Sequence, residues 1–223
     1  GLCGALALAV LYLDPATPLY RGRWRIAWLA LAGLLAALIF SLGVGIRSST
    51  ADYRIRMRSF YGGLRVMDEG AGAEATRKLM HGTINHGTQY LNEVLRRRPT
   101  TYYGEKSGVG LAIRERQEYG SMKVGVIGLG TGTLAAYGRE GDEYRFYEIN
   151  PQVIELARTR FTYLADCRAH VEIALGDARL SLERAPDASL DFLVLDAFSS
   201  DAVPVHLLTR EAIELYFRKL KPS

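Results

Sequence analysis

The sequence has few cysteines and no compact set of metal ligands. Its 223 residues include only Cys3 and Cys167, which do not make a disulfide framework, and its histidines and cysteines show no spacing typical of a zinc site. The net charge of +4 comes from dispersed arginines, with one short cluster at 96–98. A solvated face or helix end is the ordinary interpretation of such a cluster. We therefore expect no metal and no nucleic-acid partner.

One long segment lacks charge altogether. The run from Ile26 to Ile46 contains no charged residue, and at about 1.5 Å of rise per residue a helix of this length crosses a hydrocarbon layer of about 30 Å. Trp24 and Trp28 stand at one end, where indole rings favour the membrane interface, and arginines flank both ends. We expect a transmembrane helix at 26–46, and a buried helix of a soluble protein is the alternative.

The first 13 residues, GLCGALALAVLYL, lack an initiator Met, a basic start and the small-residue cleavage site of a signal peptide. We expect them to be the end of a further span, so that residues 1–50 form a membrane segment of a multi-pass protein of the cell inner membrane. Arginines are almost equally numerous on the two flanks of 26–46, so the positive-inside rule does not orient the chain. We place the remainder in the cytoplasm because the nucleoside inferred below is made there.

Residues 51–121 have the pattern of a small antiparallel β unit followed by a linker. Apolar side chains alternate with arginines over 53–58, which is typical of a half-buried strand. Gly62 and Gly63 permit a tight reversal, and a second region of short strands follows at 77–91. Residues 100–110 have a loop-like composition.

After residue 122, apolar strands alternate with helices. We expect strands at 123–128, 144–149, 170–175 and 190–196, and helices at 133–140, 150–164, 178–185 and 210–221. This alternation predicts the α/β fold class with a doubly wound parallel sheet, whose ligand lies at the carboxyl ends of the strands. We expect 122–223 to be a nucleoside-binding domain that lacks its C-terminal part.

Three glycines, Gly128, Gly130 and Gly132, alternate directly after the first of these strands. Such a loop lets a ligand lie against backbone amides at the start of a helix. Glu148 ends the next strand, where a carboxylate can accept hydrogen bonds from both ribose hydroxyls. A dinucleotide site would usually have glycine where Thr133 stands, so the pattern favours a nucleoside without phosphates, such as S-adenosylmethionine (SAM). A glycine-rich turn without a ligand is the alternative.

A third element follows the strand at 170–175. Gly176 and Asp177 stand directly after it, with Ala178 next in the chain. A Gly-Asp pair alone is usually only a turn. In this register, however, the carboxylate of Asp177 can accept a hydrogen bond from the amino group of adenine, and we expect an adenine site here.

Four segments taken in order resemble the spermidine synthase family of aminopropyltransferases: VGVIGLGTG at 124–132, YEINP at 147–151, GDAR at 176–179 and VLDAFSSD at 194–201. The similarity is to bacterial membrane-fused forms, in which transmembrane helices precede a domain with the class I SAM-dependent methyltransferase fold. It extends from about Tyr53 to the end of the chain. Val126 stands where many methyltransferases carry an acidic residue, and a β unit precedes the sheet as in the polyamine enzymes.

The resemblance implies a transferase that uses decarboxylated SAM or SAM as co-substrate and a small amine as acceptor. Asp196 would be the catalytic carboxylate, which attracts the ammonium and removes its proton. Two further residues, Asp201 and Tyr102, would assist it. The implied acceptor-site residues are His81, Gln89 and Tyr103. The implied donor-site residues are Gly128, Gly130, Thr131, Gly132, Glu148, Asp177 and Ala178.

The sequence departs from the family pattern on the acceptor side. Thr131 stands where the family has an aspartate in its glycine loop, and His81 stands where it has another acid. Asp201 follows Asp196 by five residues instead of three, Gln89 is displaced, and only Tyr102 matches the Tyr-His-Glu segment of the family. The missing acids would have held a polycation, so the donor half of the pattern is intact and the acceptor half is altered.

Two other functions remain open. The same fold could serve a SAM-dependent methyltransferase or another SAM-cleaving enzyme, and a domain with an inactive acceptor site could act as a nucleoside-sensing module coupled to the membrane helices. His81 and His86 are more easily interpreted as residues that shape the acceptor pocket than as metal ligands. A homo-oligomer is compatible with the family resemblance.

Overall fold

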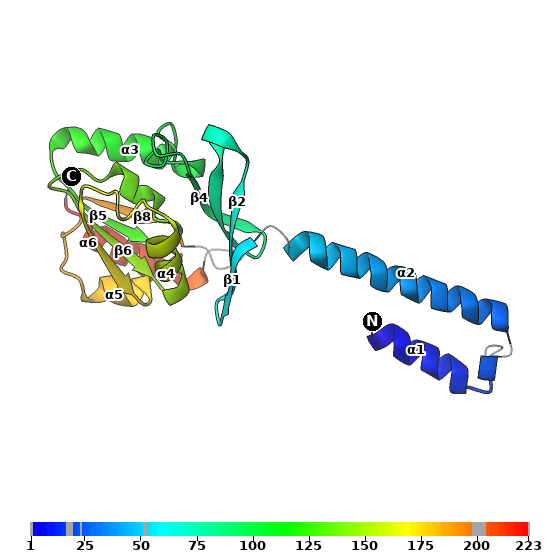
Figure 1. The fold of residues 1–223 in the computed structure, drawn as a ribbon. Coiled ribbons are helices and arrows are strands. Elements are labelled where there is room, and N and C mark those ends of the chain that lie inside the picture. The colour runs from blue at the N-terminus through cyan, green and yellow to red at the C-terminus, as the bar shows by residue number, and fades with distance from the viewer. Residues whose placement is uncertain (1, 17–19, 23, 51–52, 198–203, 223) are drawn as a thin grey trace. The chain divides into compact units, whose positions relative to one another are not determined.

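A computed structural model describes residues 2–16, 20–22, 24–50, 53–197 and 204–222. The chain divides into two compact units, Gly1–Asp52 and Tyr53–Ser223, and Figure 1 shows the helices of the first and the two sheets of the second.

The first unit consists of two helices, α1 (Leu2–Leu13) and α2 (Arg25–Thr50), with a short 3₁₀ turn at Tyr20–Gly22 between them. The rings of Tyr12 and Trp28 meet edge to face, with centroids 5.7 Å apart. Within α2, the stretch Arg25–Gly45 has the length and apolar composition of a membrane span, and none of it is buried. Among the described residues it is the only helix that meets this test. The 12 residues of α1 would extend about 18 Å, so a second span stays a prediction.

The second unit begins with the predicted antiparallel sheet. Its four strands are neighbours in chain order, and the hairpins that join them are short. The first strand alternates half-buried and exposed side chains along its whole length, as the apolar–arginine pattern predicts. The strands are β1 (Tyr53–Ser59), β2 (Gly62–Glu69), β3 (Thr76–His81) and β4 (Ile84–Tyr90).

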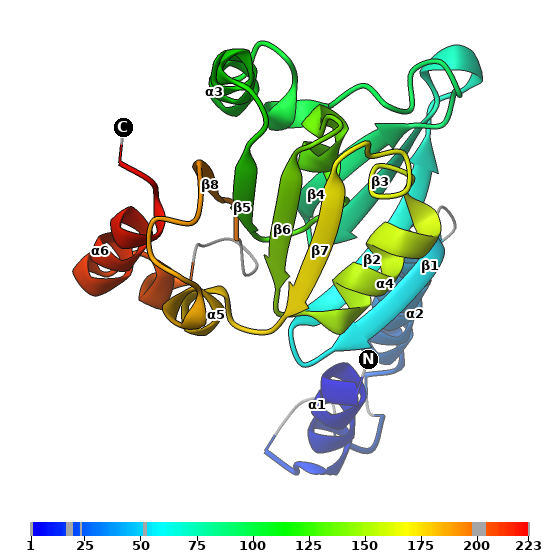
Figure 2. The same ribbon diagram turned by 90° about the vertical axis from the view of Figure 1, so that its left-hand side faces the viewer.

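The predicted parallel sheet follows, with the strand order β7-β6-β5-β8, as Figure 2 shows. The order reverses at β5, because β6 pairs with one of its edges and β8 with the other. In a doubly wound sheet this reversal opens a crevice at the carboxyl ends of the strands. The strands are β5 (Lys123–Ile127), β6 (Glu143–Glu148), β7 (His170–Leu175) and β8 (Phe192–Leu195), and the helices are α3 (Gly108–Arg116), α4 (Pro151–Arg160), α5 (Ala178–Arg184) and α6 (Arg210–Lys219).

One hydrophobic core joins the two sheets. Leu64 and Leu79 from the antiparallel sheet belong to the same buried cluster as Val124 and Phe146 from the parallel sheet. The sequence division at 122 therefore marks a change from antiparallel to parallel strands, and the core continues across it. This packing holds the antiparallel sheet close to the ends of β5 and β6.

Several elements differ in extent or type from the sequence prediction. The strand expected at 190–196 is β8, Phe192–Leu195, and the helix expected at 210–221 ends at Lys219. Helix α4 ends at Arg160, short of the predicted 164, because Phe161 and Tyr163 turn into the core. The predicted helix at 133–140 is a 3₁₀ helix, Thr133–Tyr137. The predicted loop at 100–110 contains a 3₁₀ turn, Thr101–Tyr103, and the start of α3.

Candidate active site

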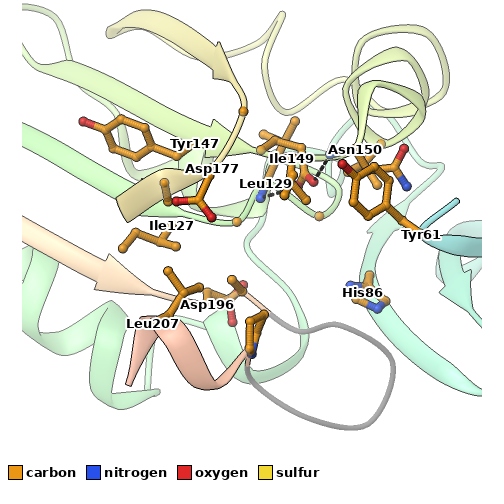
Figure 3. Close-up of a pocket in the computed structure, with 18 of the residues that line it drawn as sticks. Tyr61, His86, Ile127, Leu129, Tyr147, Ile149, Asn150, Asp177, Asp196 and Leu207 are labelled. Atoms are coloured by element: carbon orange, nitrogen blue, oxygen red, sulfur yellow. Dashed lines mark hydrogen bonds between the residues drawn. The ribbon is translucent and has the colours of Figure 1, made fainter. Parts of the chain in front are cut away.

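A cavity lies at the carboxyl ends of the parallel strands, and the antiparallel sheet supplies its opposite wall (Figure 3). The described lining combines a glycine loop, three carboxylates, three histidines and apolar side chains. The lining residues are Tyr61, Leu64, His81, His86, Ile127, Gly128, Leu129, Gly130, Tyr147, Glu148, Ile149, Asn150, Val153, Gly176, Asp177, Ala178, Asp196, Ala197, Pro204, His206 and Leu207.

The glycine loop needs glycine at each alternate position. Gly128, Gly130 and Gly132 have φ values of +99°, +54° and +82°, a region that side chains with a Cβ rarely adopt. A Cβ at Gly128 would lie 2.5 Å from the carbonyl oxygen of Asp196, and one at Gly130 would lie 2.5 Å from the carbonyl oxygen of His86. The glycines therefore let the loop pass between the end of β8 and strand β4.

Glu148 joins the glycine loop to the turn after β6. Its Oε2 accepts a hydrogen bond from the backbone N–H of Leu129 (3.1 Å), and its Oε1 accepts one from Asn150 (2.8 Å). Burial raises the pKa of this carboxyl, and the backbone donors oppose that shift. Each carboxylate oxygen can accept more than one hydrogen bond. Glu148 can thus keep both backbone contacts and still accept hydrogen bonds from a ligand's hydroxyl groups.

Asp177 caps the start of α5 and contacts a histidine from across the cavity. Its Oδ1 accepts a hydrogen bond from the backbone N–H of Leu180 (3.0 Å), and its Oδ2 lies 2.9 Å from Nε2 of His206. The carbonyl oxygen of His206 in turn accepts a hydrogen bond from Arg179 (3.1 Å). The carboxylate at this end of the cavity is therefore held in place from two sides.

Asp196 follows β8 and is hydrogen-bonded to the hydroxyl of Tyr103. Burial raises the pKa of Asp196 to about 6, and the hydrogen bond from Tyr103 partly offsets the rise. The pKa of Tyr103 is raised by its own burial and by the nearby carboxylate, so this tyrosine keeps its proton. The hydroxyl of Tyr102 lies 3.1 Å from that of Tyr103. The result is a carboxylate with a raised pKa that is oriented by a phenol.

Two histidines on the antiparallel wall face the cavity. The rings of His81 and His86 have centroids 5.3 Å apart. Burial and the proximity of His81 lower the pKa of His86 to about 4, so its imidazole is neutral at physiological pH. Its Nε2 is buried and has no hydrogen-bond partner among the described residues.

Seven of the site residues inferred from the sequence line this one cavity: Gly128, Gly130, Glu148, Asp177, Ala178, Asp196 and His81. Tyr103 and Tyr102 reach it through Asp196. Asp201 lies outside the described residues. The roles assigned to all of these residues stay predictions.

Three other inferred residues lie outside the described lining. Thr131 is buried, with its hydroxyl 2.8 Å from that of Thr133, and Gly132 packs against Leu164. The amide of Gln89 donates hydrogen bonds to the Arg96 carbonyl oxygen and the Thr162 hydroxyl, and it accepts one from the Thr162 backbone (2.9 Å each).

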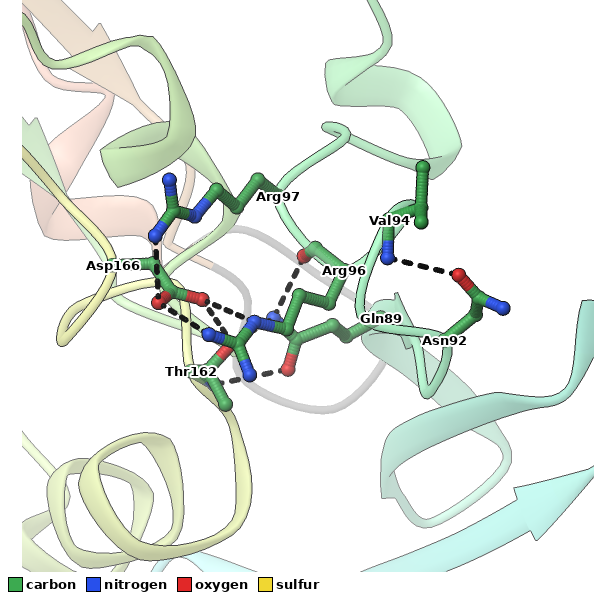
Figure 4. Close-up of polar contacts among 7 residues, drawn as sticks. All are labelled: Gln89, Asn92, Val94, Arg96, Arg97, Thr162 and Asp166. Carbon is green, nitrogen blue, oxygen red and sulfur yellow. Dashed lines mark hydrogen bonds and ion pairs between the residues drawn. The ribbon is translucent and has the colours of Figure 1, made fainter. Parts of the chain in front are cut away.

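Gln89 thus belongs to a polar cluster that joins β4 to the end of α4 (Figure 4). In the same cluster, Asp166 accepts hydrogen bonds from Thr162 (2.7 Å) and Arg96 (3.1 Å). Arg96 and Arg97, from the cluster that the sequence suggested was a solvated face or helix end, both pair with Asp166. The sequence suggests Gln89 for the acceptor site, but the fold shows that its amide is hydrogen-bonded to Arg96 and Thr162 within the protein.

Sequence reasoning did not assign Tyr61 or His206 to the site, and it gave His86 only a general part in shaping the acceptor pocket. No local motif surrounds them, and each reaches the cavity from an element distant in sequence from the glycine loop. Histidine is rare in this sequence, which has four, and three of the four line this cavity. The rarity of histidine is the only signal in the sequence that could have pointed to His206. Within the described residues, no group of three or more His, Cys, Asp or Glu side chains is arranged to hold a metal ion.

Comparison with known proteins agrees with this architecture. The chain is 34% identical over 91 residues to the polyamine aminopropyltransferase of Vibrio vulnificus (strain CMCP6), a match that covers 39% of this chain and 30% of that protein. The chain therefore spans less than a third of the length of this relative. No protein-family model matches the chain.

A solved structure shows a similar fold. A probable spermidine synthase from Corynebacterium glutamicum ATCC 13032 superposes with a TM-score of 0.61 at 19% identity, over 75% of this chain and 60% of that chain. A spermidine synthase in complex with the transition-state analogue AdoDATO gives a TM-score of 0.49 at 16% identity, over 76% and 55% of the two chains, a similarity too low to add weight. The chain is thus similar in sequence, over 91 residues, to a polyamine aminopropyltransferase, and similar in fold to a probable spermidine synthase.

Proposed function

We propose that this chain is a membrane-anchored transferase that moves an alkyl group from a sulfonium nucleoside, either SAM or decarboxylated SAM, to a small amine. The observation that carries the proposal is the placement of Glu148, beside the glycine loop, and of Asp196, at the end of β8, in one cavity. The first is suited to holding a ribose and the second to accepting a proton. The similarity to a polyamine aminopropyltransferase supports the same class of reaction.

The donor would lie along the α/β wall of the cavity. Glu148 would accept hydrogen bonds from the ribose hydroxyls, and the glycine loop would lie under the sugar without side chains in the way. The base would extend toward Asp177, where Ala178 and Leu207 supply apolar contacts. His206 contacts Asp177 and would therefore border the base as well.

Asp196 would prepare the acceptor. An amine is protonated in water and cannot act as a nucleophile until it loses a proton, and a carboxylate with a pKa of about 6 is a better proton acceptor than an ordinary aspartate. The nitrogen lone pair then forms a bond to the carbon next to the sulfonium sulfur. The carbon–sulfur bond breaks with its electron pair going to sulfur, which leaves as a neutral thioether.

The test is product analysis with the full chain in lipid nanodiscs. The chain is incubated with decarboxylated SAM or SAM and a set of mono- and diamines, and the nucleoside product is identified by mass spectrometry. Methylthioadenosine from decarboxylated SAM supports alkyl transfer of the aminopropyl kind. S-adenosylhomocysteine from SAM instead indicates a methyltransferase. Binding of either donor without turnover indicates a sensing module and contradicts the proposed reaction.

The location of the protein is part of the proposal. The span at Arg25–Gly45 would anchor the chain in the inner membrane, and the site would face the cytoplasm, where SAM is made. Membrane fractionation and protease protection of the second unit test both points. Size-exclusion chromatography with light scattering tests whether the chain forms a homo-oligomer.

A further inference from the structure

We propose that the outer face of the antiparallel sheet is a docking surface for the anionic headgroups of the membrane that α2 would span. The face is defined by three arginines, Arg56 and Arg58 of β1 and Arg65 of β2. This inference rests on the membrane anchor of the proposed function and does not depend on the proposed reaction. It is carried by the orientation of the strands, by the unpaired charge of the face and by its short covalent distance from the span.

The antiparallel sheet has one face in the core and one face outside it. The inner face carries Leu64, Val66 and Leu79, which belong to the buried cluster shared with the parallel sheet. Figure 1 shows α4 and the parallel sheet on one side of the antiparallel sheet. Successive residues of a strand point to opposite faces. Arg65 stands between Leu64 and Val66 and therefore lies on the outer face.

Arg56 and Arg58 share this face with Arg65. Arg56 of β1 is the direct partner of Arg65 in the strand register, and directly paired residues lie on the same face of a sheet. Arg58 follows Arg56 by two positions, so it points to the same side. Both arginines of β1 are exposed, and β1 is an edge strand of its sheet. The outer face thus presents a row of cations along an open edge.

The pairing of Arg56 with Arg65 is unfavourable in itself, because like charges directly opposite each other destabilise a sheet. The ring of Tyr53 lies beside both guanidinium groups, with its centroid 5.4 Å from Cζ of Arg56 and 4.7 Å from Cζ of Arg65. Arg65 also donates hydrogen bonds to the Tyr53 hydroxyl (2.8 Å) and to the carbonyl oxygen of Gly82. These contacts orient the two cations and neutralise neither.

The three arginines form no ion pair with any described acidic residue. The two acids of the sheet already pair with other basic residues: Asp68 with Arg54 and Arg77, and Glu69 with Lys78. Glu74 belongs to the turn after β2, at the opposite end of that strand from the partner of Arg58. Strands β1 to β4 contain six arginines and lysines and two acidic residues. The sheet alone therefore carries a net charge equal to the +4 of the whole chain.

A membrane surface fits both the charge and the position of this face. The apolar stretch of α2 ends at Gly45, and Tyr53, the first residue of β1, follows eight residues later. A chain extends by at most about 3.6 Å per residue, so the start of β1 lies within about 29 Å of the end of the span. Anionic lipids attract basic segments beside a membrane helix. A row of separate cations also suits a surface with many headgroups better than it suits one small anion.

A second copy of the chain fits the face less well. In a two-fold symmetric contact the same patch is used by both subunits. The arginines of one copy would then meet those of the other, and like charges across an interface oppose association. We therefore commit to anionic lipid as the occupant, and a second copy is one of the outcomes that the experiment below can reveal.

Arginine labelling with phenylglyoxal on the full chain in lipid nanodiscs tests the inference. Discs of phosphatidylcholine are compared with discs that also contain phosphatidylglycerol, and the labelled residues are identified by mass spectrometry of peptides. We expect Arg56 and Arg58 to react about fivefold more slowly in the anionic discs, the effect of one basic residue at an anionic surface. Added salt should reduce the difference. Arg184 of α5 is exposed and is the internal control, whose labelling should be equal in both discs.

Two variants locate the effect in the charge of Arg56. We expect the Tm of the wild-type chain to be at least about 2 °C higher in anionic than in neutral discs, because binding to the folded state stabilises it. Arg56→Gln should show a smaller increase, whereas Arg56→Lys keeps the charge and should keep the increase. In neutral discs the Tm of Arg56→Gln should change little, since the substitution also removes the repulsion from Arg65. That measurement reports that the variant is folded.

The outcomes separate this inference from the proposed function. Equal labelling of Arg56 and Arg58 in the two kinds of disc, or a full increase in Tm in Arg56→Gln, would overturn lipid docking and leave the transferase proposal standing. Slow labelling in both kinds of disc would also overturn it, and light scattering would then show whether a second copy covers the face. A chain that does not insert into discs would overturn both lipid docking and the membrane anchor.

Discussion

The two walls of the cavity differ in how their polar groups are satisfied. On the α/β wall, Glu148 and Asp177 each hold backbone N–H groups of neighbouring turns, so these carboxylates are fixed by the fold itself. On the antiparallel wall, His86 is buried with an Nε2 that no described residue bonds. The carboxylates of one wall are thus satisfied within the fold, whereas one polar atom of the other wall is not. The α/β wall should therefore govern folding and chemistry.

The largest effect should come from Asp196 on the α/β wall. Asp196→Asn keeps the shape of the side chain but cannot accept the proton of the acceptor amine, and we expect the rate of transfer to fall about 100-fold or more. Donor affinity, measured by calorimetry, should change little. Asp187→Asn is the matched control, because Asp187 is an exposed aspartate that pairs with Lys219 away from the cavity. A decrease of less than about threefold in Asp196→Asn would show that another group removes the proton.

The glycine loop should show the next largest effect, on stability. In Gly130→Ala the new Cβ would meet the carbonyl oxygen of His86 at 2.5 Å in a backbone conformation with positive φ. We expect a loss of about 1–3 kcal/mol in the free energy of unfolding, measured as a lower Tm. In Gly63→Ala, the control, the new methyl meets no atom within 4 Å and the Tm should hold. Equal Tm values for the two variants would mean that β4 does not hold the loop closely.

Replacement of Glu148 should lower the affinity for the donor nucleoside more than the affinity for the acceptor amine. Glu148→Gln keeps an oxygen for one backbone contact but loses the charge and one acceptor position, so we expect donor affinity to fall about tenfold. The KM for the amine should stay nearly constant, which steady-state kinetics with each substrate varied in turn can show. An unchanged donor affinity would place the ribose elsewhere.

The smallest effect should be a shift of the pH profile. Asp196 must be deprotonated to act as a base, and its pKa is raised to about 6, so kcat/KM should decline about tenfold per pH unit below that value. Because the Tyr103 hydrogen bond lowers this pKa, Tyr103→Phe should move the acidic limb to higher pH. Tyr102→Phe is the control, since the Tyr102 hydroxyl contacts that of Tyr103; its limb should move less. If the acidic limb does not move in Tyr103→Phe, the pKa seen in the profile does not belong to Asp196.

The local parts of the site could be predicted from short stretches of sequence. Alternating apolar residues and arginines in β1 predict a half-buried strand, and the apolar strand before Gly128 predicts a turn with a helix start after it. Glu148 and Asp177 could be placed because each ends or follows a strand, and parallel strands bring their carboxyl ends to one edge. These inferences need only the order of residues along the chain.

The contacts that complete the site join residues far apart in the chain, and no local pattern encodes them. Tyr103 is hydrogen-bonded to Asp196, which lies 93 residues further along the chain. Gln89 is hydrogen-bonded to Thr162, which lies 73 residues further along. For this reason the sequence could suggest Gln89 for the acceptor pocket, whereas the fold shows its amide engaged within the protein. The same reason explains why Tyr61 and His206 were not assigned.

The sequence by itself determined the α/β order of strands and helices, the glycine loop and the carboxylates at the ends of β6, β7 and β8. Only the tertiary structure decided that an antiparallel sheet forms the second wall, that Tyr103 contacts Asp196 more closely than Tyr102 does, and that a neutral imidazole faces the cavity. The physical reason is that backbone conformation follows from neighbouring residues. Burial, and with it the pKa of Asp196 and of His86, depends on which distant elements pack together.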